Sequence, residues 1–238
     1  MSRPDFDFDS LSELHDSVNK LLHSPDMKLE IIHQGQEKSA HQVSEASLKM
    51  ADSCAAAKDL LLLAKAHLQN LQSAFRRIAA SAEASADHAG NSFAPHRLPR
   101  KQLKKAILKR LNSLKGMKST FAAASPPPED PSLVVVVNLL KEVRATTTLI
   151  VRSLLSLIAI PNPDRKPDSG RRDPVFRIKL TRVDSFSVWE KCDVSNIPTM
   201  VKRLEEVEVV VEDMEAELER MFRRLISTRA SLLNILTS

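Results

Sequence analysis

Apolar residues recur along two long stretches of the chain in alternating steps of three and four positions. The first stretch ends near residue 80, and the second runs from about Pro198 to Leu236. This spacing puts one side chain per turn on the same face, which predicts two long amphipathic helices with coiled-coil-like seams. The first seam consists of Val43, Ser47, Met50, Cys54, Ala57, Leu61, Ala64, Leu68, Leu71, Phe75 and Ile78. The second consists of Met200, Leu204, Val207, Val211, Met214, Leu218, Met221, Leu225, Thr228, Leu232 and Ile235.

Three further helices are predicted between positions where proline would break a helix. A short one runs from Ser10 to His23, with Leu11, Leu14, Val18, Leu21 and Leu22 on one face. The next begins near Pro99, and its apolar stripe consists of Leu103, Ile107, Leu111, Leu114 and Met117. The last, Asp130 to Ile160, is apolar nearly all round but is interrupted by charged residues. We expect it to be a buried central helix rather than a membrane span.

Helices this long need neighbours of similar length to cover their apolar faces. We therefore predict an all-α fold, an elongated antiparallel bundle of about four long helices plus a short N-terminal helix. We expect a single domain over 1–238, with loops at 81–98 and 124–131 and a proline-rich, poorly ordered insertion at 161–197. The seams could be buried within one chain or shared with a second copy, so a homodimer stays open.

The composition excludes several other classes of protein. Only 4 glycines and no tyrosines are present, which argues against a barrel, a sandwich or a fold with a glycine-rich nucleotide loop. The two cysteines are too few for a disulfide framework, so we expect free thiols in a reducing compartment. The first residues lack the features of a signal or transit peptide, and we expect an intracellular, cytoplasmic protein.

No residue pattern indicates catalysis. The seven histidines have no metal-ligand spacing, and neither a nucleophile motif nor a phosphate-binding loop occurs. We therefore expect no catalytic residue, metal or cofactor, and we expect the histidines to lie on the surface or to cap helices. The sequence predicts a protein that is not an enzyme.

The positive charge is concentrated in one segment. Nine basic residues and no acids lie between Arg97 and Lys118, whereas Glu205 to Glu219 holds eight acids and no base. Lysines attract anionic lipid or nucleic acid without specificity, and the absence of stacking aromatics disfavours nucleic acid. The other interpretations are a solvated face, or attraction to the acidic segment in the same bundle. The candidate anion or lipid surface consists of Lys101, Lys104, Lys105, Lys109 and Arg110.

The end of the last predicted helix combines apolar and basic residues. Arg223, Arg224 and Arg229 are expected to bond terminal carbonyls or to pair with acids of a neighbouring helix. An exposed part of the seam could also receive a helix of another protein. The candidate docking residues are Leu218, Phe222, Leu225 and Leu232.

Several segments resemble one protein family in their amino-acid sequences and in their order along the chain. They include HDSVNKLLHSP at 15–25, KQLKKAILKRLNSLKGM at 101–117, and LERMFRRLISTRASLLNIL at 218–236. They are similar to the plant-specific, BYPASS-related family of helical proteins. The resemblance implies an all-helical fold and a role in root and shoot development, and it implies no catalytic residue or cofactor.

Two functional hypotheses follow. The first is a non-enzymatic protein that acts by binding an unidentified protein partner in plant development. The alternative is a peripheral membrane-surface protein that binds anionic lipid through the basic helix 97–118.

Overall fold

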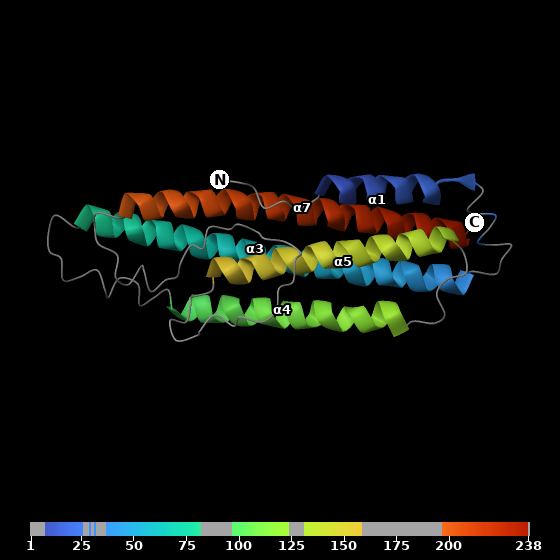
Figure 1. The fold of residues 1–238 in the computed structure, drawn as a ribbon, viewed down its shortest axis with the longest axis horizontal. Coiled ribbons are helices and arrows are strands. Elements are labelled where there is room, and N and C mark those ends of the chain that lie inside the picture. Colours follow the sequence, from blue (N-terminus) through green and yellow to red (C-terminus); the bar gives the residue numbers. More distant parts are fainter. Residues whose placement is uncertain are drawn as a thin grey trace, which may run out of the picture. The chain divides into compact units, whose positions relative to one another are not determined.

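The computed structural model describes residues 8–25, 29, 31, 37–81, 97–123, 131–158 and 197–237. Every regular element in these ranges is an α-helix, which confirms the predicted all-α fold. The helices are α1 (Phe8–Leu22), α3 (Glu37–Ser81), α4 (Arg97–Ala123), α5 (Pro131–Ile158) and α7 (Ile197–Thr237) (Figure 1).

Proline positions explain where three helices begin. Pro131 is the first residue of α5, Pro198 the second residue of α7, and Pro99 the third residue of α4. Proline fits the first turn because the backbone N–H that it lacks has no intrahelical partner there. Helix α4 therefore begins two residues before the predicted start.

The predicted loops fall almost entirely outside the described residues. The described ends of the segment 81–98, which are Ser81, Arg97 and Leu98, are helical, and so are Pro131 and Ile197. At Ser81, Arg97, Leu98 and Ile197 the helices extend beyond their predicted bounds, whereas Pro131 lies within the predicted helix from Asp130 to Ile160.

The chain divides into two compact units. The first contains Leu60–Leu108 and Arg152–Met214. The second contains Phe6–Asp59, Lys109–Val151 and Glu215–Ser238. Helices α3, α4, α5 and α7 each contribute residues to both units, and α1 belongs to the second.

Both predicted seams are buried. On α3 every seam residue is buried except Leu68, which is half-buried. On α7 every seam residue from Leu204 to Ile235 is buried. Burial thus follows the three-and-four spacing, as expected when an amphipathic helix packs its apolar stripe against neighbours.

The core of the first unit includes a cluster from α3 and α7. Phe75 lies fully buried beside Leu71 and Ile78 of α3 and Ile197 and Leu204 of α7. A buried aromatic side chain removes a large apolar area from water, so this cluster holds the two helices together.

Helices α3 and α7 are antiparallel in each unit. In the second unit Glu45 pairs with Arg229, and Lys58 pairs with Glu219. In the first unit Lys65 pairs with Glu212, and Arg76 pairs with Glu205. Within each unit the α7 number falls as the α3 number rises, which defines opposite helix directions.

Candidate functional site

Several glutamates in the acidic segment of α7 have partners on α3. Lys58 Nζ donates a 2.8 Å hydrogen bond to Glu219 Oε2, which raises the pKa of Lys58 and lowers that of Glu219. Gln69 and Gln72 both donate to Glu208, and the hydrogen bond from Gln69 is the main cause of its lowered pKa. Glu208 and Glu219 therefore have partners on α3, and not on the basic helix that one of the open interpretations paired with the acidic segment.

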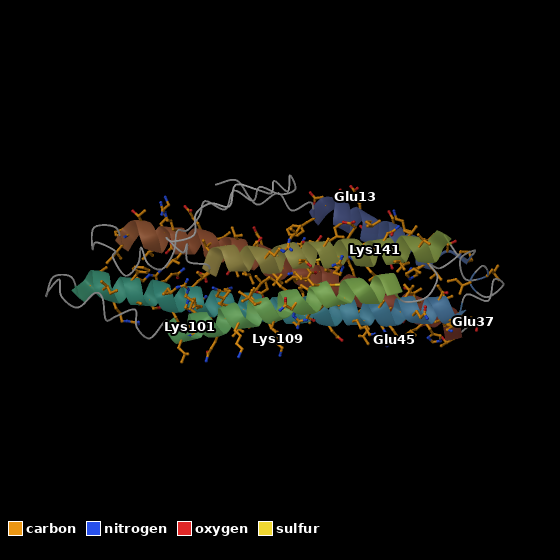
Figure 2. All side chains as sticks on the ribbon, turned by 60° about the horizontal axis from the view of Figure 1, so that its bottom comes forward. Glu13, Glu37, Glu45, Lys101, Lys109 and Lys141 are labelled. Carbon is orange, nitrogen blue, oxygen red and sulfur yellow. The ribbon has the colours of Figure 1, made fainter. Side chains whose placement is uncertain are left out.

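The basic face of α4 carries the candidate lipid-binding residues. Lys101, Lys104, Lys105 and Lys109 are exposed, and Arg110 is half-buried. Figure 2 shows Lys101 and Lys109 projecting outward from α4. The opposite side of the helix packs inward through Leu103, Ile107, Leu111 and Leu114.

Two leucines interrupt this basic face. Leu98 is 63% exposed and Leu108 is 44% exposed. Leu98, Lys101, Lys105 and Leu108 follow steps of three and four, so they share one side of the helix. The basic face therefore presents apolar side chains beside cationic ones, a combination typical of helices that lie at a membrane interface.

The candidate docking residues on α7 are not equally accessible. Leu218, Leu225 and Leu232 are completely buried, and Phe222 is half-buried. Ile226, one turn beyond Phe222, is 38% exposed, and Leu233 on the same side is half-buried. We call Phe222, Ile226 and Leu233 the α7 stripe.

The arginines around the α7 stripe form the expected cross-helix pairs in two cases. Arg229 lies 3.2 Å from Glu45 of α3, and Arg224 lies 3.7 Å from Asp16 of α1. Arg223 instead pairs with Glu219 one turn earlier on α7, at 2.7 Å, and its side chain is 76% exposed. These pairs help to orient α7 between α1 and α3 in the second unit.

Helix α1 runs parallel to α7. Asp16 lies beside Arg224, and His23 shares a surface hollow with Ser231. The residue numbers of both helices therefore rise by seven in the same direction, which defines a parallel pair. Figure 1 shows α1 alongside the C-terminal part of α7. The residues of α1 that are buried are Leu11, His15, Val18 and Leu22.

The interface of α1 contains a buried histidine. Neither ring nitrogen of His15 has a hydrogen-bond partner among the described residues. Burial, together with the positive charge of Arg224, lowers the pKa of the imidazole from 6.5 to about 4. A buried polar group without a partner costs roughly 1–3 kcal/mol, so His15 weakens the contact that it occupies.

The expectation that the histidines are surface or capping residues is therefore partly wrong. His15 and His67 are buried, because both occupy positions on inward helix faces. His23 does cap its helix: its Nδ1–H donates to the Asn19 carbonyl oxygen at 2.7 Å. His41 is exposed.

The described cysteine is a buried structural thiol. Cys54 is free, and its Sγ lies 3.5 Å from Thr147 Oγ1 of α5. The Thr147 hydroxyl donates to the Val143 carbonyl oxygen, so the thiol donates to Thr147. Burial raises the pKa of the Cys54 thiol to about 12, which keeps it in the unreactive protonated form at neutral pH.

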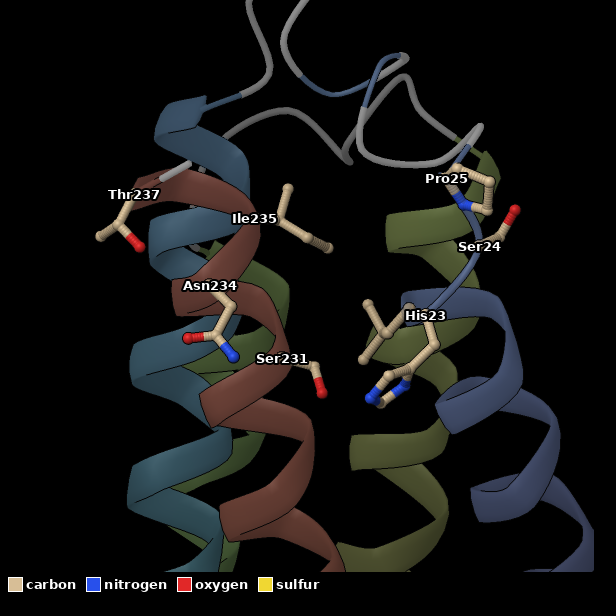
Figure 3. A pocket seen from close by; sticks show the side chains of 8 residues that line it. His23, Ser24, Pro25, Ser231, Asn234, Ile235 and Thr237 are labelled. Carbon is tan, nitrogen blue, oxygen red and sulfur yellow. The ribbon is translucent and has the colours of Figure 1, made fainter.

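An open hollow lies where α1 and α7 end. It has a volume of about 430 Å³, and its polar groups come from His23, Ser24, Ser231, Asn234 and Thr237. Figure 3 shows the His23 ring and the Ser231 hydroxyl on opposite walls. Leu22, Pro25 and Ile235 supply apolar surface. These groups could hydrogen-bond a small polar molecule, but the Thr237 hydroxyl already donates to the Leu233 carbonyl oxygen.

The described part of the chain contains no group of three or more His, Cys, Asp or Glu side chains that could hold a metal ion. None of the helices described there combines the length and the apolar character needed to cross a bilayer.

The described helices and their buried seams place this protein in the all-α class. Its candidate binding surfaces are the basic face of α4 and the α7 stripe. The sequence matches the family model described as Protein BPS1 over residues 7–235. The chain therefore belongs to the BPS1 family, which confirms the resemblance to BYPASS-related proteins. Neither a curated protein nor a solved structure matches it.

Proposed function

We propose that this protein is a non-enzymatic interaction protein that binds another protein during root and shoot development. The α7 stripe is the observation that carries the proposal, because Phe222, Ile226 and Leu233 leave apolar surface accessible on one side of the C-terminal part of α7. The developmental role rests on membership of the BPS1 family.

The partner would present an amphipathic helix to the α7 stripe. Apolar side chains spaced by three and four on that helix would cover Phe222 and Ile226. Arg223 extends beside the stripe and could attract an acidic flank of the partner. Aromatic residues and arginines commonly contribute most of the binding energy at such interfaces, on the order of 2 kcal/mol or more each.

Proximity labelling in root tissue tests this proposal. We expect the wild-type protein to label a discrete set of neighbours that Ile226→Asp loses, because a carboxylate on the stripe cannot be buried without cost. Leu63→Asp is the control, since Leu63 is also an exposed apolar residue, 55% exposed, and lies on α3 in the other unit. Partners purified from the labelled set should bind the wild-type protein and the control variant in calorimetry.

Identical labelling by Ile226→Asp and wild type would reject the stripe as the docking surface. Light scattering on the purified protein tests whether the partner is a second copy of this chain. A mass twice that of one chain, lost in Ile226→Asp, would make the partner a second copy of this chain.

A second candidate function is binding to an anionic membrane surface through α4. The basic face supports it, because Leu98 and Leu108 could enter the lipid interface while the lysines contact phosphates. Each lysine held near an anionic bilayer contributes roughly 1 kcal/mol, so several together would give salt-dependent binding.

Vesicle sedimentation tests the second candidate. Binding to vesicles that contain an anionic phospholipid should occur at low salt and should disappear when Lys101, Lys104, Lys105, Lys109 and Arg110 are all changed to Gln. The control variant changes five other exposed lysines to Gln: Lys20, Lys38, Lys49, Lys141 and Lys202. Equal losses in both variants, or no binding at low salt, would exclude a specific role for α4.

A further inference from the structure

The contact between α1 and α7 has an unusually polar side. Residues of α7 at steps of three and four, beginning with Glu217, share the face that Arg224 and Ser231 turn toward α1. This face consists of Glu217, Met221, Arg224, Thr228, Ser231 and Ile235. Four of these six side chains are polar, and Glu217, Thr228 and Ser231 are buried. Little of the stabilisation of this contact can therefore come from apolar burial on the α7 side.

Helix α1 depends on this contact for its own stability. It has 15 residues, and isolated helices of that length are marginal in water. Its buried face contains three apolar residues, Leu11, Val18 and Leu22, with His15 in the middle. The imidazole occupies the position where a fourth apolar side chain would continue the seam.

We propose that α1 is a detachable helix whose hold on α7 is released when His15 becomes protonated. A protonated imidazole has two N–H donors, and His15 has no acceptor for either among the described residues. It would also place a second positive charge near Arg224 in a buried interface. Detachment exposes the ring to water, where the charge is solvated.

The other charges in the interface act in different directions. Asp16 favours protonation of His15, but its side chain is mostly exposed and lies beside Arg224. Burial raises the pKa of Glu217, and the negative charge of Asp9 raises it further, whereas Arg220 and Arg224 oppose this rise. Acid therefore favours the attached state through Glu217 and the detached state through His15.

The sign of the His15 effect follows from its two environments. When α1 is detached, the imidazole titrates near 6.5, and when α1 is attached its pKa is about 4. The detached state thus binds more protons between these values, and attachment weakens as the pH falls through that window. At pH 5.5 the detached fraction should be about tenfold larger than at pH 7.5, from the linkage of one proton.

Hydrogen–deuterium exchange of the whole protein tests the proposal. We expect the protection factors of α1 amides to fall about tenfold between pH 7.5 and 5.5, while those of α3 stay constant. His15→Leu removes the titrating imidazole and completes the apolar face, so its α1 protection should no longer fall as the pH falls. His15→Gln, which cannot become charged, should likewise show no fall, because the remaining Glu217 favours attachment in acid. His41→Gln, at an exposed histidine on α3 outside the contact between α1 and α7, should behave like the wild type.

Three outcomes would overturn the proposal. The first is wild-type α1 protection that does not change with pH. The second is a fall in α1 protection with falling pH that persists in both His15 variants, which would assign the effect to a group other than His15. The third is an equal fall in α1 and α3, which would indicate unfolding of the whole unit. None of these outcomes bears on the α7 stripe, so this proposal and the proposed function fail separately.

Discussion

Leu225→Ala is expected to lower the free energy of unfolding by about 2–5 kcal/mol. Leu225 is completely buried on α7, so the shorter side chain loses apolar burial and leaves a cavity. Urea unfolding followed by circular dichroism at the helical minimum would measure the loss as a lower midpoint with an unchanged slope.

Ile226→Ala is the matched control at the next residue. Ile226 is partly exposed, so we expect a loss of roughly 1 kcal/mol or less. Equal losses for the two variants would contradict the orientation of α7. The comparison also decides how binding data are interpreted, because a binding defect in Leu225→Ala would reflect stability, whereas one in Ile226→Asp would reflect the stripe.

The candidate docking residues therefore divide into two groups. Leu218, Leu225 and Leu232 support the packing of the second unit, and only Phe222 contributes to a surface that another protein can reach. The sequence could not separate them, because all four fit the apolar face of one helix. The number of neighbours that cover this face is decided by tertiary packing.

The helices and seams were predictable because the spacing of apolar residues by three and four positions is a property of each helix sequence alone. The partners of charged residues were not. The glutamates of α7 pair with Lys58, Lys65 and Arg76 of α3, although the basic helix has the higher charge density. Which helix lies beside which depends on packing, and opposite charge alone selects no neighbour.

The burial of one residue and the exposure of another could have been predicted from the sequence. His15 lies on the apolar face of the first helix, at the correct spacing from Leu11 and Val18, so its burial follows from its position. Leu108 lies among the lysines of α4 rather than on the apolar stripe, so its exposure also follows from its position. The position of a residue on its helix face, rather than its residue type, predicts both the burial of His15 and the exposure of Leu108.

The chemistry of the buried polar groups is consistent with structural roles. The Cys54 thiol is held protonated, and the Thr147 hydroxyl that accepts its hydrogen bond is itself bonded to its own helix. Buried polar side chains of this kind connect helices by satisfying one another. They add specificity to the packing of α3 against α5.

The antiparallel pairing of α3 and α7 determines which of their faces are buried and which are available to partners. Cysteines at Glu45 with Arg229, and at Lys58 with Glu219, define two matched pairs within the second unit. The crossed pairs are Glu45 with Glu219 and Lys58 with Arg229. Positions 45 and 58 are about 20 Å apart along α3, from the helical rise per residue.

Crosslinking with a short bismaleimide, in a background of Cys54→Ala and Cys192→Ser, measures this pairing most directly. We expect efficient crosslinks in both matched pairs and very little crosslinking in both crossed pairs, because the crossed positions lie several turns apart. Efficient crosslinks in the crossed pairs, with little reaction in the matched ones, would show parallel helices and would contradict the fold described here.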